Sequence, residues 1–393
     1  MNFSELARNL GGPKNPLYLL HDRLKAEGRP IVDLVRGNVN EHGIVYPRAA
    51  LDEILSGAAE EARIYRPDSL GQEPARRAVA SYYASLGVSP QHILLTPGTS
   101  VSYWYCFKLL AEAGDEILCP RPAYPLFDYI ATLCGVRLTH YRLLEARGWA
   151  IDLDHLEHQI TTKTRAIVLI SPHNPTGMVA DAAQLSGLAE IAGRHNLPII
   201  SDEVFSEFLF GIDSLPRAAA TAAPLVFTLN GFSKMFALPG MKAGWMAVTG
   251  DDALVKQAMS ALELISDTFL PVNEIAQFAV EKIFSRGQEF LKSYREWVTA
   301  CRDRALAGLS GAAFVEPRGG FYITLPIVDS EENAAAALLE KNGILVHPGY
   351  FYDIDPDHLV MTFIHDPESL TSHFETIKKT IGHGGLLEPG EKP

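Results

Sequence analysis

The 393-residue sequence has few cysteines, an excess of acidic over basic side chains, and no long hydrophobic segment. The four cysteines show no CxxC spacing, so we expect neither a metal site nor a disulfide framework, but reduced thiols in a cytoplasmic protein. A formal net charge of −13 argues against nucleic acid or an anionic membrane as a partner. Residues 1–12 have no apolar signal-type segment, and no apolar run of about 18 residues occurs, so a soluble protein is expected.

The sequence does contain enough apolar residues for a large core. Hydrophobic residues make up 47% of the chain and charged residues 21%, as in ordinary globular proteins, and the length allows two domains. From about residue 90, short apolar segments alternate with helical patterns. This alternation predicts an α/β fold with a mostly parallel central sheet flanked by helices.

Two of the predicted strands, Arg165–Ser171 and Leu197–Ser201, are almost continuously apolar, which is typical of strands covered on both faces. Asn174 follows the first strand, and Asp202 follows the second. Ligands of open parallel sheets bind beyond the carboxyl ends of the strands. These two polar residues are therefore candidates for a binding site.

The pattern changes after two predicted helices at residues 252–266 and 273–290. Beyond them the sequence predicts helices at 293–309 and 334–341, and strands at 314–315, 320–325, 344–346 and 359–363. Together these elements suggest a smaller α+β domain that packs with an N-terminal helical arm. The predicted divisions are residues 1–45 for the arm and part of the small domain, 46–285 for the large ligand-binding domain, and 286–393 for the C-terminal small domain.

One lysine stands in a glycine-rich segment between two apolar runs, Pro224–Leu229 and Trp245–Val248. An amine held in a turn beside a strand end can lose contact with water, which lowers its pKa and makes it a nucleophile or base at neutral pH. Taken alone, Lys234 is more simply interpreted as a solvated surface lysine. The residues that accompany it elsewhere in the chain favour the first interpretation.

The turn Thr96–Ser100 leads from a predicted strand at 92–95 into a predicted helix at 101–111. The unpaired amides and the dipole at the start of a helix favour an anion, and the hydroxyls of Thr99 and Ser100 can add hydrogen bonds to phosphate oxygens. An ordinary helix cap is the alternative.

Ser233-Lys234, followed by the segment Phe236–Trp245, resembles the lysine segment of class I and II aminotransferases. The resemblance continues in the family's order over nearly the whole chain, through Tyr65, Gly98-Thr99-Ser100, Tyr124, Asn174–Gly177 and Asp202-Glu203-Val204. Each short match is weak, but the ordered set is specific. The resemblance implies a fold-type I transferase that depends on pyridoxal 5′-phosphate (PLP).

The same resemblance implies a role for each matching residue around the ring. Lys234 would hold the cofactor as a Schiff base and carry a proton, and Asp202 would keep the ring nitrogen protonated. Asn174 would donate to the 3-oxygen of the ring. Tyr124 would stack on the ring, unless it is a buried core tyrosine. Gly37 would line the substrate pocket together with Asn174, unless it is a plain turn glycine.

The resemblance also implies how the phosphate is held and how the chain assembles. A homodimer is expected, because the family's matching tyrosine reaches the cofactor of the opposite subunit. The expected phosphate ligands are Gly98, Thr99, Ser100, Ser233, Lys242 and, from the second chain, Tyr65.

The chain departs from the family pattern at four positions. Phe205, beside the ring, replaces a tyrosine that usually donates to the ring oxygen, and Gly231 stands where a phosphate-binding serine is common. Lys242 replaces the usual phosphate arginine and loses its bidentate geometry. Most seriously, Val360 stands where the family carries the arginine that binds the α-carboxylate of the substrate.

The leading prediction is a PLP-dependent aminotransferase that moves an amino group from an amino acid or amine donor to a keto acid by a ping-pong mechanism. Arg36, Arg121 and Arg318 are conceivable substitutes for the missing arginine. Because that arginine is absent, a PLP-dependent lyase, cyclase or decarboxylase remains an alternative. A non-catalytic ligand-binding homologue is less consistent with the sequence, since Lys234 and Asp202 are both present.

Overall fold

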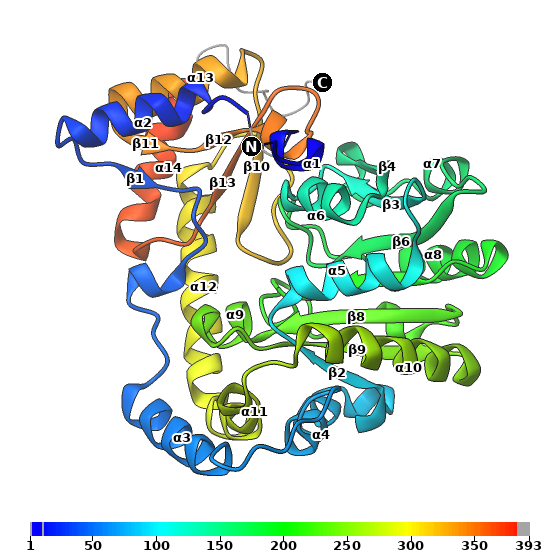
Figure 1. Cartoon of the computed structure of the whole chain (residues 1–393). Coiled ribbons are helices and arrows are strands. Elements are labelled where there is room, and N and C mark those ends of the chain that lie inside the picture. Colours follow the sequence, from blue (N-terminus) through cyan, green and yellow to red (C-terminus); the bar gives the residue numbers. More distant parts are fainter. Residues whose placement is uncertain (1, 10–11, 383–393) are drawn as a thin grey trace.

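The computed structural model describes residues 2–9 and 12–382. Its helices are α1 (Glu5–Asn9), α2 (Pro16–Ala26), α3 (Arg48–Glu61), α4 (Glu73–Tyr82), α5 (Thr99–Leu110), α6 (Leu126–Cys134), α7 (Leu153–His158), α8 (Ala182–His195), α9 (Phe232–Met235), α10 (Asp252–Phe269), α11 (Glu274–Arg286), α12 (Gln288–Gly308), α13 (Glu331–Ala337) and α14 (Pro367–Ile381). Its strands are β1 (Val32–Asp33), β2 (Ile93–Thr96), β3 (Glu116–Arg121), β4 (Arg137–Leu144), β5 (Ala150–Ile151), β6 (Thr164–Ile170), β7 (Ile199–Asp202), β8 (Leu225–Gly231), β9 (Gly244–Gly250), β10 (Tyr322–Pro326), β11 (Ile344–Leu345), β12 (His347–Pro348) and β13 (His358–Thr362). Figure 1 shows a large α/β part beside a smaller group of helices and strands.

An eight-stranded sheet forms the larger part, in the order β2-β9-β8-β7-β6-β3-β4-β5. The five strands from β8 to β4 in this order are parallel to one another. Strand β9 runs antiparallel to β8 and to β2, and β5 runs antiparallel to β4. The predicted α/β fold with a mostly parallel central sheet is therefore confirmed.

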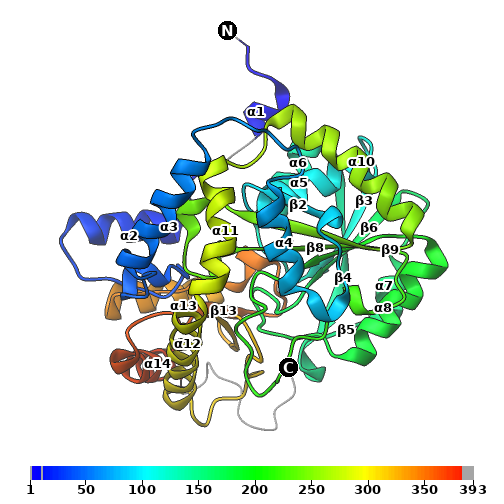
Figure 2. The same ribbon diagram turned by 90° about the horizontal axis from the view of Figure 1, so that it is seen from below.

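Strand β6 shows how both faces of this sheet are buried. Ile167 and Leu169 belong to the same apolar core as Leu188 of α8, whereas Val168 and Ile170 belong to the second core, which includes residues of α5 and α10. Neighbouring side chains in a strand point to opposite faces. The continuous apolar run is explained by this double coverage, and Figure 2 shows helices on both sides of the sheet.

The smaller part contains two short sheets. Strands β10, β13 and β12 form an antiparallel sheet in that order, and β1 pairs in parallel with β11, so the N-terminal and C-terminal segments share a sheet. The strand predicted at residues 314–315 is wrong, because this stretch is irregular. It is only two residues long and is soon followed by Pro317, which has no amide hydrogen for a sheet. The positions at which the domains divide stay a prediction.

Helix α12 spans the boundary between the two parts (Figure 1). It packs against α14 of the smaller group and contacts α11, which packs against α3 and α4. None of the described helices combines the length and apolar character needed to cross a membrane.

Candidate active site

Three parallel strands bring the candidate residues to one edge of the large sheet. Asp202 is the last residue of β7, Asn174 lies in the loop after β6, and Lys234 lies in α9 directly after β8. Asp202 is in register with Ile170 of β6 and Leu229 of β8, so the three carboxyl ends open at the same edge. This is the edge at which open parallel sheets bind ligands.

A cavity of about 190 Å³ lies at this edge. Tyr103, Leu126, Phe127 and Tyr322 contribute to its wall. Eight of the residues predicted for the site also line it: Thr99, Ser100, Tyr124, Asn174, Asp202, Phe205, Ser233 and Lys234. The structure thus brings the predicted lysine and the predicted aspartate to one cavity, although their roles in catalysis stay predictions.

Asp202 is almost completely buried, with 8% of its surface exposed. The loss of solvent raises its pKa to about 6, although two hydrogen bonds act in the opposite direction. The hydroxyl of Tyr103 donates to Oδ2 over 2.9 Å, and the amide of Val204 donates to Oδ1 over 3.0 Å. The carboxylate is therefore fixed in orientation and poorly solvated, which suits it to face a positive charge on a ligand.

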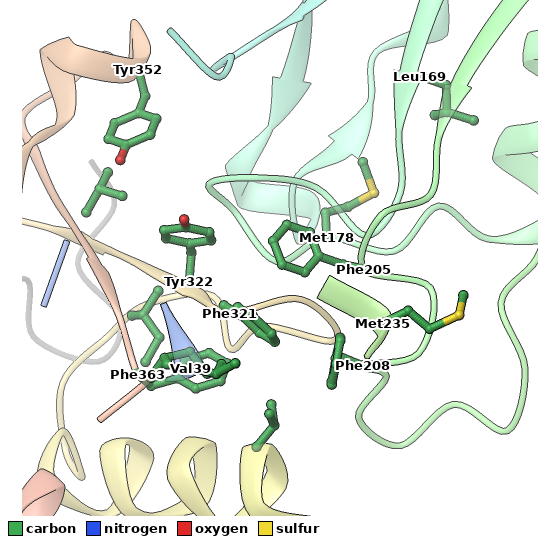
Figure 3. Packing of buried hydrophobic residues seen from close by; sticks show 14 of the residues in the cluster. Val39, Leu169, Met178, Phe205, Phe208, Met235, Phe321, Tyr322, Tyr352 and Phe363 are labelled. Atoms are coloured by element: carbon green, nitrogen blue, oxygen red, sulfur yellow. The ribbon is translucent and has the colours of Figure 1, made fainter. Parts of the chain in front are cut away.

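Lys234 lies among aromatic rings. Its Nζ atom is 5.7 Å from the ring centres of both Phe205 and Phe321, and it donates to the carbonyl oxygen of Gly37 over 3.3 Å. Figure 3 shows Phe205 and Phe321 close together in this region. The loss of solvent lowers the pKa of the amine to about 8. The structure supports the interpretation of Lys234 as a partly desolvated amine rather than a solvated surface group.

The start of α5 forms the third wall of the cavity. Gly98 occupies the cap position with φ of 114° and supplies no side-chain hydrogen bond, so the ordinary helix cap weighed for Thr99 and Ser100 is not observed. Gly98 also packs tightly on Gly244, since a Cβ atom at position 244 would lie 3.0 Å from the Cα atom of Gly98. The uncapped amides of a twelve-residue helix are suited to bind an anion.

The positions of Tyr124 and Gly37 bear on the alternatives given for them above, a buried core tyrosine and a plain turn glycine. Tyr124 is 42% exposed and borders the cavity, which is inconsistent with a buried core tyrosine. Gly37 faces the site closely, because a Cβ atom there would lie 3.4 Å from the hydroxyl of Tyr322 and 3.8 Å from Nζ of Lys234. A side chain at position 37 would therefore narrow the space beside the lysine.

The residues present fit the expected cofactor. An aldehyde requires an amine such as Lys234, a ring nitrogen that carries a proton requires a carboxylate such as Asp202, and a phosphate requires free amides. The buried Oδ1 atom of Asn174 has no hydrogen-bond partner among the described residues, so it is left to bind a polar group of a ligand. Among the described residues, no group of three or more acidic, histidine or cysteine side chains is arranged to hold a metal ion.

A second, larger cavity of about 780 Å³ adjoins the first. The two cavities share Lys234, Ser233, Tyr124, Leu126 and Tyr322. The larger cavity is also lined by residues of the N-terminal segment, of β12 and of the turn after it, among them Gly37, His347 and Tyr352. Lys234 thus stands between a small cavity with an acidic end and a large one open to a substrate.

Three predicted phosphate ligands do not line the small cavity: Gly98, which directly precedes α5, and the more distant Tyr65 and Lys242. Tyr65 is 75% exposed and borders a separate hollow together with Leu270. Lys242 is also exposed, in a left-handed conformation with φ of 50°, two residues before Gly244. Their predicted roles therefore rest on the resemblance and not on proximity within one chain.

The position of the missing arginine is filled by a buried apolar side chain. Val360 is 1% exposed, lies in β13 and pairs with Thr324 on one side and His347 on the other. Of the three conceivable substitutes, Arg36 alone lines the larger cavity. Its Nε atom lies 3.3 Å from Asp33. The remaining two, Arg121 and Arg318, are exposed and line neither cavity.

Sequence reasoning missed several residues that shape the site. Tyr103, which holds Asp202, could have been found, because it stands four residues after Thr99 and so shares its face of the helix. Tyr322, His347 and Tyr352 had no such signal. They reach the cavity only because the smaller part of the molecule packs against the larger one.

Comparison with known proteins gives a consistent result. A family model for aminotransferase class I and II matches residues 30–377. The chain is 31% identical over 366 residues to the glutamate-pyruvate aminotransferase AlaA of Escherichia coli, covering 88% of this chain and 89% of that protein. It is also 31% identical over 364 residues to an alanine aminotransferase of Mycobacterium tuberculosis, covering 88% and 84%.

Solved structures agree with these relatives. An aminotransferase from Escherichia coli superimposes with a TM-score of 0.86 and 27% identity, covering 98% of this chain and 99% of that one. An alanine aminotransferase from Pyrococcus furiosus superimposes with a TM-score of 0.87 and 25% identity, covering 96% and 100%. The chain belongs to the class I and II aminotransferases, enzymes of fold type I that use PLP to transfer amino groups.

Proposed function

We propose that the chain transfers an amino group from an amine-bearing donor to a keto acid, with Lys234 as the residue that carries the cofactor. The observation that supports this most directly is the position of Lys234 and Asp202 on the wall of one cavity, beside the uncapped start of α5. Gly98, Thr99, Ser100 and Ser233 would hold the phosphate at that end.

Asp202 and its neighbours prepare the acidic end of the cavity. When bound, PLP supplies a positively charged ring that withdraws electrons from the carbon next to the reacting amine. The carboxylate of Asp202 would stabilise that positive charge, and Tyr103 keeps the carboxylate in place through its hydrogen bond. Because Asp202 is buried, its interaction with a charged ring is weakly screened by water.

Lys234 would move the proton. With a pKa of about 8, its amine exists partly in the neutral form near neutral pH, so Nζ can accept a proton from the reacting carbon and return it. Phe205 and Phe321 cover the amine with apolar rings and limit the access of water. The carbonyl oxygen of Gly37 fixes its direction.

We also propose that the active form is a homodimer in which the partner subunit's Tyr65 completes the phosphate site. In a single chain, Tyr65 borders a hollow together with Leu270 and Ile275, which are 69% and 38% exposed, and its neighbour in sequence, Ile64, is 59% exposed. Monomeric proteins seldom leave such a group open to water, and a second copy of the chain would bury it.

Reduction of the PLP-loaded protein with borohydride, followed by peptide mass spectrometry, tests the role of Lys234. We expect a pyridoxyl group on this residue, and none at this position in the Lys234→Ala variant. The variant Lys256→Ala, which removes an exposed lysine of α10, serves as the matched control and should label like the wild type. Labelling at another lysine alone would contradict the assignment.

Absorbance separates amino transfer from other PLP reactions. Addition of an amine donor should bleach the visible band of the cofactor, and addition of a keto acid should restore it. Product formation without a keto acid would instead indicate a lyase.

A further inference from the structure

The larger cavity is poor in usable positive charge. Among the described residues that line it, the lysine and arginine side chains are Lys234, which would carry the cofactor, and Arg36. Arg36 already has an acidic partner, since its Nε atom lies 3.3 Å from Asp33, and its side chain is 65% exposed to water. Glu41, also on the wall, adds a negative charge and accepts a hydrogen bond from Asn38. A carboxylate bound deep in this cavity would find no free cation among the described residues of this chain.

The wall around the position of the missing arginine is built from uncharged polar groups. His347 pairs with Val360 across the strands, and it connects two tyrosines. Its Nε2 atom lies 2.7 Å from the hydroxyl of Tyr18, and its Nδ1 atom lies 3.1 Å from the hydroxyl of Tyr352. Burial lowers the pKa of His347 to about 4, so the ring is neutral at physiological pH.

Because the imidazole is neutral, the hydrogen-bonding groups that Tyr18, His347 and Tyr352 offer to a ligand can be worked out. One ring nitrogen carries a hydrogen and the other accepts one. One tyrosine therefore donates to the ring, while the other accepts from the ring and keeps its own hydrogen free. Whichever tautomer is present, the three side chains offer a ligand one hydroxyl donor and one hydroxyl acceptor, without net charge.

The chain of hydroxyls continues towards Lys234. Figure 3 shows the hydroxyl groups of Tyr322 and Tyr352 pointing into the same gap. Burial, with the nearby hydroxyls of Tyr322, Tyr124 and Tyr18, raises the pKa of Tyr352 well above its usual range. Aromatic surface flanks this row, because Phe351 stacks on the ring of His347 with the centroids 4.5 Å apart. This part of the cavity is therefore lined by uncharged hydroxyl and imidazole groups together with aromatic surface.

A carboxylate and a primary amide differ in charge and in their ability to donate hydrogen bonds. A carboxylate only accepts hydrogen bonds, so one hydroxyl of the row would face it with lone pairs, and burial of its charge would be uncompensated. An amide both donates and accepts, and it carries no charge. It therefore matches the pair of hydroxyls that His347 connects.

We propose that this cavity selects a donor amine with an apolar or aromatic body and an uncharged hydrogen-bonding group, such as a primary amide or a hydroxyl, over the counterpart with a carboxylate at that place. The recognising residues are Tyr18, His347 and Tyr352, with Tyr322 next to the lysine. The proposal rests on the proposed function, because it names the substrate class of the same site. The keto acid acceptor meets the same uncharged groups, so we expect it to bind weakly.

Calorimetric titration of the PLP-loaded protein at about pH 7.5 tests the selection, since a carboxylic acid is fully ionised there. The ligands are 3-phenylpropanamide and 3-phenylpropanoate, which have no amine and cannot react. We expect the amide to bind about tenfold more tightly than the acid. Equal affinity, or a preference for the acid, would overturn the proposal.

Two variants of one residue separate recognition from folding. His347→Phe keeps the ring stack but removes both hydrogen bonds, so both tyrosine hydroxyls become free to donate to a carboxylate. It should abolish the roughly tenfold preference for the amide over the acid. His347→Gln, which still donates and accepts, should retain most of the amide affinity. If both variants keep the wild-type preference for the amide over the acid, Tyr18, His347 and Tyr352 do not select the ligand.

Failure of this inference is distinguishable from failure of the proposed function. Amino transfer to a keto acid together with tighter binding of 3-phenylpropanoate would leave the function standing and overturn the inference. Selective binding of the amide in a protein that transfers no amino group would do the reverse, because neither ligand takes part in a reaction.

Discussion

At the scale of single residues, the site is defined by two ionisable groups that have lost most of their water. Burial raises the pKa of Asp202 to about 6 and lowers that of Lys234 to about 8. Both shifts disfavour the charged form of the side chain. A positively charged ligand would favour the ionised form of Asp202, and a ligand with a reactive carbonyl would consume the neutral amine of Lys234. The residues that make the site reactive therefore destabilise the apoprotein.

Replacement of Asp202 by asparagine tests whether the buried carboxyl group destabilises the apoprotein. The folded state binds the carboxyl proton more tightly than the unfolded state, whose pKa is about 3.9, so wild-type stability falls as the pH rises from about 4 to about 6. Asparagine cannot ionise, so the stability of the Asp202→Asn apoprotein does not fall in this way. Relative to the wild type, its free energy of unfolding should rise by up to about 3 kcal/mol as the pH increases from about 4 to about 6. Urea unfolding of the two apoproteins at both ends of this pH range measures the change.

The control for this substitution is Asp252→Asn, at an exposed position of α10. It should leave the pH dependence unchanged. A difference between wild type and Asp202→Asn that stays constant with pH would show that the carboxyl group is not perturbed as described.

At the scale of secondary structure, close backbone contacts position the phosphate end. The strand β9 begins at Gly244, and β2 pairs with it through Thr96, two residues before Gly98. The absence of a side chain at position 244 allows the start of α5 to approach the segment that follows Lys234. Gly231 is similarly confined, because a Cβ atom at that position would lie 3.0 Å from the carbonyl oxygen of Ala243.

Gly244→Ala should disturb this contact. The added methyl group would lie 3.0 Å from both the Cα atom of Gly98 and the carbonyl oxygen of Asn230, so the backbone must shift. We expect a loss of about 1–3 kcal/mol in the free energy of unfolding and about tenfold in the affinity for PLP. Denaturant titration and absorbance titration with PLP measure the two effects.

Gly240→Ala provides the comparison within the same segment. No atom lies within 4 Å of a Cβ atom at that position, so both quantities should stay near the wild-type values. If the two alanine variants behave alike, the contact between Gly98 and Gly244 does not position the phosphate end.

At the scale of the whole molecule, one chain leaves the proposed phosphate site incomplete. Tyr65 lies apart from the cavity and borders a separate hollow together with the exposed side chains of Leu270 and Ile275. A two-fold symmetric dimer would present the same surface of each chain to the other, and each subunit could then supply its tyrosine to its partner.

Mixed dimers of the Tyr65→Ala and Lys234→Ala variants test shared sites. Each variant by itself has a defect in both sites, whereas a hybrid contains one site with both defects and one without any. Random mixing should therefore restore about a quarter of the wild-type activity per chain. Activity equal to the average of the two parent variants would show that Tyr65 does not act across subunits.

The sequence by itself determined the α/β fold and the edge of the sheet at which the site lies. Continuous apolar strands required coverage on both faces, and polar residues after their carboxyl ends marked the ligand edge, as Asp202 and Asn174 do. The glycine-rich setting of Lys234 and the ordered matches from Thr99 to Val204 added the expected chemistry. These signals are local, so they can be recognised along the chain.

The tertiary structure alone decided what surrounds the lysine. Phe321 and Tyr322 approach it from β10 and the residues before it, and His347 joins Tyr18 to Tyr352 across more than three hundred positions of the chain. Such contacts depend on how the smaller part packs against the sheet, and no local pattern specifies them. The identity of the cavity's polar groups, on which the proposed substrate class rests, follows from that packing.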